Sequence, residues 1–218
     1  MKLHLLSIAA IAAFTLTACG DNANETKVTG ADTTATTGAN VGSEHTYHID
    51  PAASSVKWKG VMLGVKQHHG TVSFTEGDLV VNNGQLTGGN FTVDLNSIAP
   101  LDSAYAAENE KQGRRSDLIG HLKSADFFDV ANHPIAKLRI LGAQGNTATA
   151  EMTLRGKTGT ETIENIQITE TNGKVRATGT MKFDRQKYDV KWDSGVKEAV
   201  LSNDIELTVD LTGTAAAI

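Results

Sequence analysis

From about Thr46 onward, hydrophobic and polar residues alternate with a period of two along much of the chain. In a β-strand, successive side chains point to opposite faces, so each alternating segment has one apolar and one polar face. The predicted strands fall within residues 56–62, 72–74, 79–81, 91–95, 135–140, 148–154, 166–169, 175–185 and 205–211. Asn83-Gly84 and Asn172-Gly173 are typical of tight hairpin turns. Many half-apolar strands joined by short turns indicate an antiparallel meander that closes on itself.

We therefore predict an all-β fold, an antiparallel β-barrel of about eight strands. A barrel of this size is either filled by its own side chains or holds one small ligand. Small residues share the inward positions with large apolar ones, for example Gly60, Ala148, Ala150 and Ala177. Small residues favour space inside the barrel, although they also suit the tapered end of a filled one.

One segment interrupts the strands with helix-forming residues. We predict a helical insertion over residues 103–123, capped by Asp102 or Ser103 and broken near Gly113. It leads into residues 121–134, where Phe127 and Phe128 lie among short polar side chains that favour turns. This stretch either plugs one end of the barrel with a buried Phe, or is a connector with a hydrophobic anchor.

The N-terminus is typical of an export signal. Lys2 precedes an apolar run from Leu3 to Phe14, which is too short for a permanent membrane span. The run ends in Leu16-Thr17-Ala18-Cys19-Gly20, which resembles a bacterial lipobox, where cleavage precedes a lipidated Cys. We predict a lipoprotein signal peptide (1–18), lipidation at Cys19, a flexible tether (19–43) and a barrel domain (44–218). The alternative is a plain secretory signal cut near Ala18, and export follows in either case.

Composition excludes some partners and some covalent links. The net charge is −5 and no cluster of Lys and Arg is present, which argues against a nucleic-acid surface. The single Cys excludes an intramolecular disulfide.

No catalytic or metal-binding constellation is visible. His68 and His69 are strand neighbours that point to opposite faces, so a shared metal ion is not expected. We expect His121 and His133 to have capping or turn roles. No resident cofactor is expected.

Arg185 shares strand parity with Met181 and Phe183, and a buried Arg needs an acid, carbonyl groups or a ligand phosphate.

The order of several motifs resembles the YceI-like family, lipocalin-like bacterial proteins that bind polyisoprenoids. The matching segments are Tyr47-His-Ile-Asp50, Ser55-Val-Lys-Trp58, Gly89-Asn-Phe-Thr-Val-Asp94, Leu118-Ile-Gly-His-Leu-Lys-Ser-Ala-Asp-Phe-Phe-Asp-Val130 with Pro134 behind it, Met152-Thr-Leu-Arg-Gly156, and Phe183-Asp-Arg185 with Tyr188. Departures occur at Asp189-Val190, at Lys137-Leu-Arg139, and ahead of Met152, and they affect the shape of the cavity.

The resemblance implies an elongated barrel whose apolar lumen holds the chain of a polyprenyl phosphate, a quinone or a similar lipid. The candidate ligand-binding residues are Phe74, Phe91, Met152, Leu154, Met181 and Phe183 in the walls, Phe127 and Phe128 at the mouth, and Arg185.

Three functions follow from this reading. The first is non-enzymatic binding, carriage or sequestration of an isoprenoid by a protein that is lipid-anchored in the bacterial cell envelope, on the periplasmic side or at the outer membrane. The second is a filled barrel that serves as an envelope interaction module. The third is an enzyme in which Arg185 and His121 line a pocket. A homodimer is compatible with the sequence.

Overall fold

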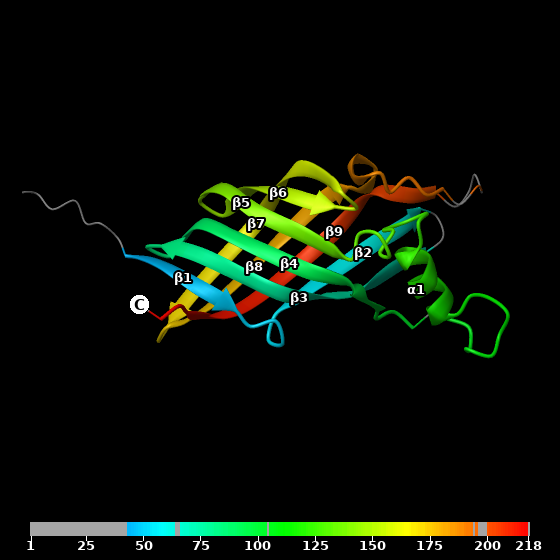
Figure 1. Ribbon diagram of the computed structural model, residues 1–218, viewed down its shortest axis with the longest axis horizontal. Helices are drawn as coiled ribbons and strands as arrows, with labels where there is room; N and C mark the ends of the chain where they lie inside the picture. The colour runs from blue at the N-terminus through cyan, green and yellow to red at the C-terminus, as the bar shows by residue number, and fades with distance from the viewer. Residues whose placement is uncertain (1–42, 64–65, 104, 194, 196–199, 218) are drawn as a thin grey trace, which may run out of the picture. The chain divides into compact units, whose positions relative to one another are not determined.

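The computed structural model describes residues 43–63, 66–103, 105–193, 195 and 200–217. Most of these residues belong to long antiparallel strands (Figure 1). The elements are β1 (Glu44–Ile49), β2 (Ser55–Leu63), β3 (Lys66–Asn82), β4 (Gln85–Pro100), α1 (Arg115–Lys123), β5 (Ile135–Gln144), β6 (Thr147–Leu154), β7 (Lys157–Thr171), β8 (Lys174–Asp184), the short 3₁₀ helix η1 (Arg185–Tyr188) and β9 (Val200–Ala215).

The strands close into a barrel with eight positions. Around the ring the order is β3-β2-β9-β8-β7-β6-β5-β4, and β4 pairs back onto β3. β1 takes no ninth position, because it pairs with β3 and β9, the same two neighbours as β2. β1 and β2 therefore form two halves of one barrel position, interrupted at residues 50–54. The predicted antiparallel barrel of about eight strands is confirmed.

The alternation in the sequence gives each strand its inward face. In β8, the alternate residues Val175, Ala177, Gly179, Met181 and Phe183 are all buried, while the residue between each pair is intermediate or exposed. Both predicted hairpin turns are present. Asn83 and Gly84 have φ values of 51° and 74°, and Asn172 and Gly173 have 50° and 72°. Two consecutive positive φ values match the right-handed twist of the flanking strands, which explains the Asn-Gly pairs.

The helical insertion is shorter than predicted. The structure has α1 only over Arg115–Lys123, so the prediction of helix from residue 103 is wrong for its first half. Asp102 does not cap a helix, because its carboxylate binds His68 and the backbone N–H of His69. At the observed start, the Asp117 carboxylate accepts a hydrogen bond from the backbone N–H of Arg114 at 2.9 Å.

Most residues from 106 to 112 are good helix formers, yet they form a loop. All of them are exposed, so a helix there would have no apolar face to bury against the barrel. Gly113, with a φ of 81°, turns the chain into α1.

The barrel has two different ends. α1 lies at one end, which we call the near end, and β1 and the C-terminus lie at the other, the far end (Figure 1). The predicted signal peptide, Cys19 and nearly all of the predicted tether lie outside the described residues. No helix within the described residues has the length and apolar character needed to cross a membrane.

Candidate functional site

The barrel encloses a cavity of about 370 Å³. Its wall is almost entirely apolar and draws on every strand from β2 to β9. All six predicted wall residues line it: Phe74, Phe91, Met152, Leu154, Met181 and Phe183. The lumen is therefore not packed with side chains, which contradicts the filled-barrel alternative. Whether these residues touch a ligand remains a prediction.

Small residues leave this space open. Gly60, Ala136, Ala177 and Gly179 all border the cavity. A Cβ atom placed on Gly60 would lie 3.5 Å from Cδ1 of Ile205, an ordinary van der Waals contact. A larger side chain at this position would therefore extend into the lumen.

The far end is closed by side chains of the barrel wall itself. Val81 and Val175 are buried there but do not line the cavity. The buried Tyr47 in β1 donates a hydrogen bond to the Glu170 carboxylate in β7 at 2.5 Å. β1 and β7 are not neighbours in the sheet, so this bond spans the end of the barrel.

The near end is closed by segments that are not strands. The first is the stretch after α1, where Phe127 is buried and its ring meets Phe128 edge to face at 4.8 Å. Both Phe rings line the cavity, as do Leu118 and Leu122 of α1. Of the two sequence-based interpretations, a plug with one buried Phe and a connector with a hydrophobic anchor, the plug matches this geometry.

The second closing segment follows β8. Tyr188 and Val190 are completely buried, and Trp192 lines the cavity. The ring of Trp192 packs against His121 of α1 with a centroid distance of 4.7 Å. The two closing segments therefore meet over the mouth of the barrel.

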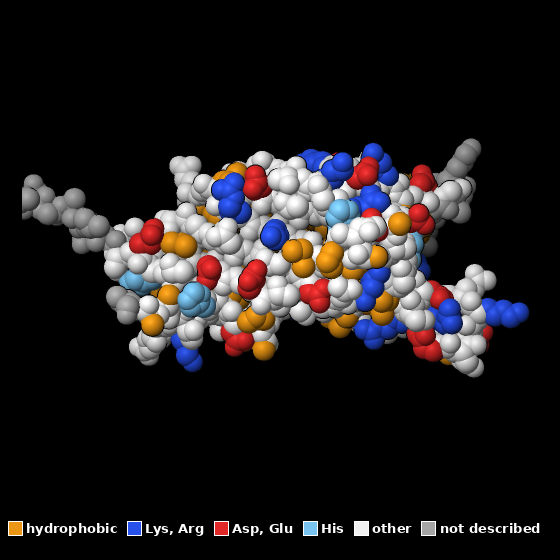
Figure 2. Space-filling model, in the orientation of Figure 1, with side chains coloured by type: hydrophobic (Ala, Val, Ile, Leu, Met, Phe, Trp, Pro, Cys, Tyr) orange, Lys and Arg blue, Asp and Glu red, His pale blue; other side chains and the backbone are white. Residues whose placement is uncertain are grey.

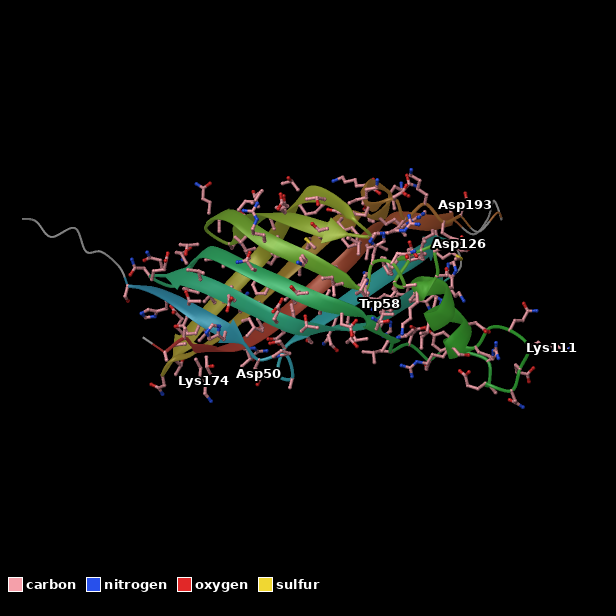
Figure 3. The ribbon with its side chains drawn as sticks, in the orientation of Figure 1. Asp50, Trp58, Lys111, Asp126, Lys174 and Asp193 are labelled. Atoms are coloured by element: carbon pink, nitrogen blue, oxygen red, sulfur yellow. The ribbon has the colours of Figure 1, made fainter. Side chains whose placement is uncertain are left out.

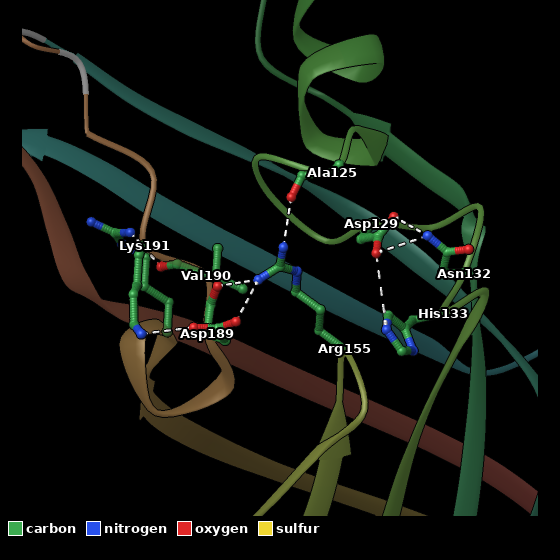
Figure 4. A network of polar contacts seen from close by, with 9 residues as sticks. Ala125, Asp129, Asn132, His133, Arg155, Asp189, Val190 and Lys191 are labelled. Carbon is green, nitrogen blue, oxygen red and sulfur yellow. Dashed lines mark hydrogen bonds and ion pairs between the residues drawn. The ribbon is translucent and has the colours of Figure 1, made fainter.

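Arg155 binds both closing segments (Figure 4). It occupies the β6–β7 turn with a positive φ of 49°. Its guanidinium donates to the carbonyl of Ala125, just before the Phe pair, at 2.6 Å. The same group donates to the backbone carbonyl of Asp189 and lies 3.3 Å from the Asp189 carboxylate. One side chain thus fixes the plug and the η1 segment to the barrel wall.

A model of the YceI-like domain matches residues 47–213, which include the barrel and both closing segments. The chain belongs to the YceI-like family. The motif Leu118–Val130 forms most of α1 and the near-end plug of this YceI-like barrel.

Solved structures share the YceI-like fold. BcnA from Burkholderia cenocepacia superimposes with a TM-score of 0.61 at 17% identity, over 76% of this chain and 99% of BcnA. A polyisoprenoid binding domain from Saccharophagus degradans, implicated in plant cell wall breakdown, gives 0.55 at 13% identity, over 78% and 98%. At these identities the likeness concerns the fold. No curated protein sequence matches the chain.

Arg185, predicted to contact the ligand, does not line the cavity of the YceI-like barrel. Its side chain is 3% exposed, and its guanidinium donates to the carbonyls of Ser202, Val190 and Leu201 at 3.0, 2.6 and 3.3 Å. The alternation of inward and outward residues does not extend to Arg185, because β8 ends at Asp184. The Asp184 carboxylate accepts a hydrogen bond from the backbone N–H of Gln186. Arg185 is therefore the first residue of η1 and ties this segment to β9.

The YceI-like barrel also buries an acid that sequence reasoning missed. Glu161 faces inward from β7 and accepts a hydrogen bond from the Tyr188 hydroxyl at 2.8 Å. Burial and this hydrogen bond raise the pKa of Tyr188. A Cβ atom on Gly159 would lie 2.8 Å from the Tyr188 hydroxyl oxygen, so a side chain there would displace the phenol.

Two histidines border the cavity near the plug. His121 lines it, but Nε2 of His121 is buried without a hydrogen-bond partner among the described residues. Burial holds the pKa of His121 below its ordinary value, although the charge of Asp126 opposes this. The enzyme alternative required Arg185 and His121 in one pocket, and the structure does not bring them together there.

His68 is the second histidine at the cavity, and its ring is paired with a carboxylate. Nδ1 of His68 lies 2.8 Å from the Asp102 carboxylate, and the ring stacks on Tyr105 with an interplanar angle of 12°. His69 is exposed, as its opposite strand parity predicts. Within the described part of the chain, no three metal-ligating side chains come together.

Charge lies on the outer surface of the YceI-like barrel. On the face shown in Figure 2, acidic and basic side chains are interspersed. Figure 3 places Lys111, Asp126 and Asp193 around the near end, and Asp50 and Lys174 toward the far end. This mixed exterior contrasts with the apolar lumen.

Proposed function

We propose that this protein binds the chain of an isoprenoid-type lipid in its lumen, without chemical change, as a carrier or sequestering protein. The observation that carries the proposal is the apolar cavity of about 370 Å³ beneath the near-end plug. An isoprenoid chain has almost no hydrogen-bonding groups, so its binding is driven by apolar area, at about 25 cal/mol for each Å² removed from water. The cavity volume also falls within the usual range of ligand pockets.

The comparisons support this choice of ligand class. The Saccharophagus degradans domain with the same fold is a polyisoprenoid binding domain. Fold alone does not establish a ligand, so the proposal rests on the shape and polarity of this chain's own cavity.

We also propose that the protein acts at the cell envelope, anchored through lipid on Cys19. The lipobox-like sequence before this residue supports the assignment. Two or three acyl chains would hold the protein on a membrane far more firmly than one. The homodimer, compatible with the sequence, remains part of this proposal.

The test is native mass spectrometry of the full-length protein, extracted from membranes in a mild detergent that is stripped in the gas phase, with identification of any released lipid. An isoprenoid adduct is the expected result. The same spectra report acylation of the peptide that begins at Cys19, and the mass of any dimer. A protein that carries no lipid and takes up no added polyprenol would contradict the binding proposal.

A matched pair of variants tests the location of the lipid. Gly60→Leu places a side chain in the lumen, where Gly60 borders the cavity. Gly88→Leu makes the same change in β4, where the new Cβ would meet Val80, which does not border the cavity. We expect Gly60→Leu to weaken polyprenol uptake about tenfold, since it fills space that the chain needs. Gly88→Leu should bind as the unsubstituted protein does, and equal weakening by both would place the lipid elsewhere.

A further inference from the structure

The cavity has one polar side chain whose orientation is fixed by a buried acid. His68 faces inward from β3, two positions from the buried Gly70, and its side chain is 16% exposed. The Asp102 side chain, 10% exposed, lies beside it with the carboxylate 2.8 Å from Nδ1. The backbone N–H of His69 donates to the other carboxylate oxygen at 3.3 Å. Loop residue Asp102 and strand residue His68 are 34 positions apart, so the barrel fold brings them together.

This arrangement decides which nitrogen of His68 can meet a ligand. Burial raises the pKa of Asp102, but hydrogen bonds from Tyr105, His68 and the backbone outweigh it and lower the pKa below its ordinary value. The carboxylate is therefore ionised and accepts a hydrogen bond from the Nδ1–H of His68, and the Tyr105 hydroxyl lies 3.2 Å from the same nitrogen. Nε2, on the opposite edge of the ring, is left as a hydrogen-bond acceptor. Among the described residues, no side chain or backbone group donates to it.

An unpaired acceptor in an apolar wall selects for a donor. A hydroxyl group supplies one, whereas an ether oxygen, a quinone carbonyl and an ionised phosphate do not. A phosphate would also approach the negative charge of Asp102. Two cations border the cavity, Lys66 and Lys137, and both are exposed, so their ammonium groups are hydrated. The guanidinium of Arg115, near Tyr105, is bound to the carbonyl of Pro100.

We propose that His68, oriented by Asp102, is the head-group site of the cavity and accepts a hydrogen bond from the hydroxyl of an isoprenoid alcohol or phenol. This inference rests on the proposed binding of an isoprenoid chain. It adds a choice of head group: hydroxyl over phosphate, ether or quinone.

The test compares three probes at pH 8: geranylgeraniol, its methyl ether and its phosphate, each titrated into the full-length protein. The alcohol and the ether share the apolar chain and differ in one donor. One hydrogen bond is worth about 1 kcal/mol, so the alcohol should bind roughly fivefold more tightly than the ether. The phosphate should bind more weakly than the alcohol by at least about tenfold, since its charge must leave water beside a carboxylate.

Two variants locate the effect. His68→Phe keeps a ring but removes the acceptor, so the alcohol should lose its advantage over the ether. His69→Phe makes the same change one residue away, on the exposed face, and should keep that advantage. Comparing the two ligands in the two proteins isolates the interaction between His68 and the ligand hydroxyl from general damage to the site. Thermal melts report folding, and the ligand comparison in the unsubstituted protein needs no variant.

The outcomes separate the two proposals. Equal binding of alcohol and ether, tighter binding of the phosphate, or an alcohol advantage that survives His68→Phe would each overturn the head-group site while leaving lipid binding intact. Failure of all three probes to bind would overturn the proposed function itself.

Discussion

The two ends of the barrel are closed by different means. At the far end, strands run to tight turns, and wall side chains such as Val81 and Val175 fill the lumen. At the near end, the plug and the η1 segment lie across the mouth, and neither belongs to the barrel sheet. Arginine side chains hold these segments, since Arg155 and Arg185 both donate to backbone carbonyls.

The comparison indicates which end can open. Separating the far end would break strand pairing, which is cooperative with the whole sheet. The near-end segments are held by a few side-chain hydrogen bonds. Regions with few stabilising contacts are the ones that open locally in folded proteins. We therefore expect changes at the near end to affect stability in proportion to how deeply each polar contact is buried.

The largest effect is expected from Arg185→Met. The substitution removes the donors to three carbonyls, the buried one of Val190 and the part-buried ones of Ser202 and Leu201. A hydrogen bond to a charged group contributes about 1.5–3 kcal/mol, so the loss of three, two of them part-buried, should cost about 3–5 kcal/mol. The free energy of unfolding should fall by about that amount in urea titrations.

Arg176→Met is the control for that prediction. Arg176 also pairs through its guanidinium, with Asp210 at 2.7 Å, but its side chain is 66% exposed. An exposed ion pair contributes about 0–1 kcal/mol, so this variant should stay close to the unsubstituted protein. Similar losses in the two variants would show that burial at the near end is not what makes Arg185 matter.

A smaller effect is expected from a tyrosine at each end. Tyr188 donates to Glu161, whose side chain is 5% exposed, and Tyr47 donates to Glu170, which is 27% exposed. Tyr188→Phe leaves a buried carboxylate short of one donor and should cost about 2 kcal/mol. Tyr47→Phe should cost about 1 kcal/mol, because water can reach Glu170. Urea unfolding of both variants tests this ranking, and a larger loss of unfolding free energy in Tyr47→Phe than in Tyr188→Phe would contradict it.

Much of the barrel could be predicted because its information is local. The period of two sets the inward face of each strand, and Asn83-Gly84 and Asn172-Gly173 mark turns by their tolerance of positive φ. The helical insertion was over-extended because most residues from 106 to 112 have helix propensity but no face to bury. A plug was one of two interpretations of the adjacent Phe residues among turn formers, which are also a local signal.

The polar contacts of the candidate site could not be predicted in this way. The closed barrel brings together three pairs that are 27 or more residues apart in the sequence: His68 and Asp102, Glu161 and Tyr188, and Arg155 and Asp189. Strand register and loop path decide these pairs, and neither is written in a local pattern. Arg185 was misplaced for a related reason, because strand parity was extended one residue into η1.

The smallest expected effect concerns alkaline pH at the far end. The hydrogen bond to Glu170, with burial and the charge of that carboxylate, raises the pKa of Tyr47 to about 12. An unfolded tyrosine loses its proton near pH 10, so above that pH the unfolded state binds fewer protons than the folded state. The stabilising contribution of this tyrosine is therefore complete below about pH 10 and is lost as the pH rises toward 12. Thermal melts across this range should show a decline that Tyr47→Phe makes shallower. An identical slope in the variant would assign the alkaline loss to other groups, such as Tyr188 at the near end, whose pKa is also raised.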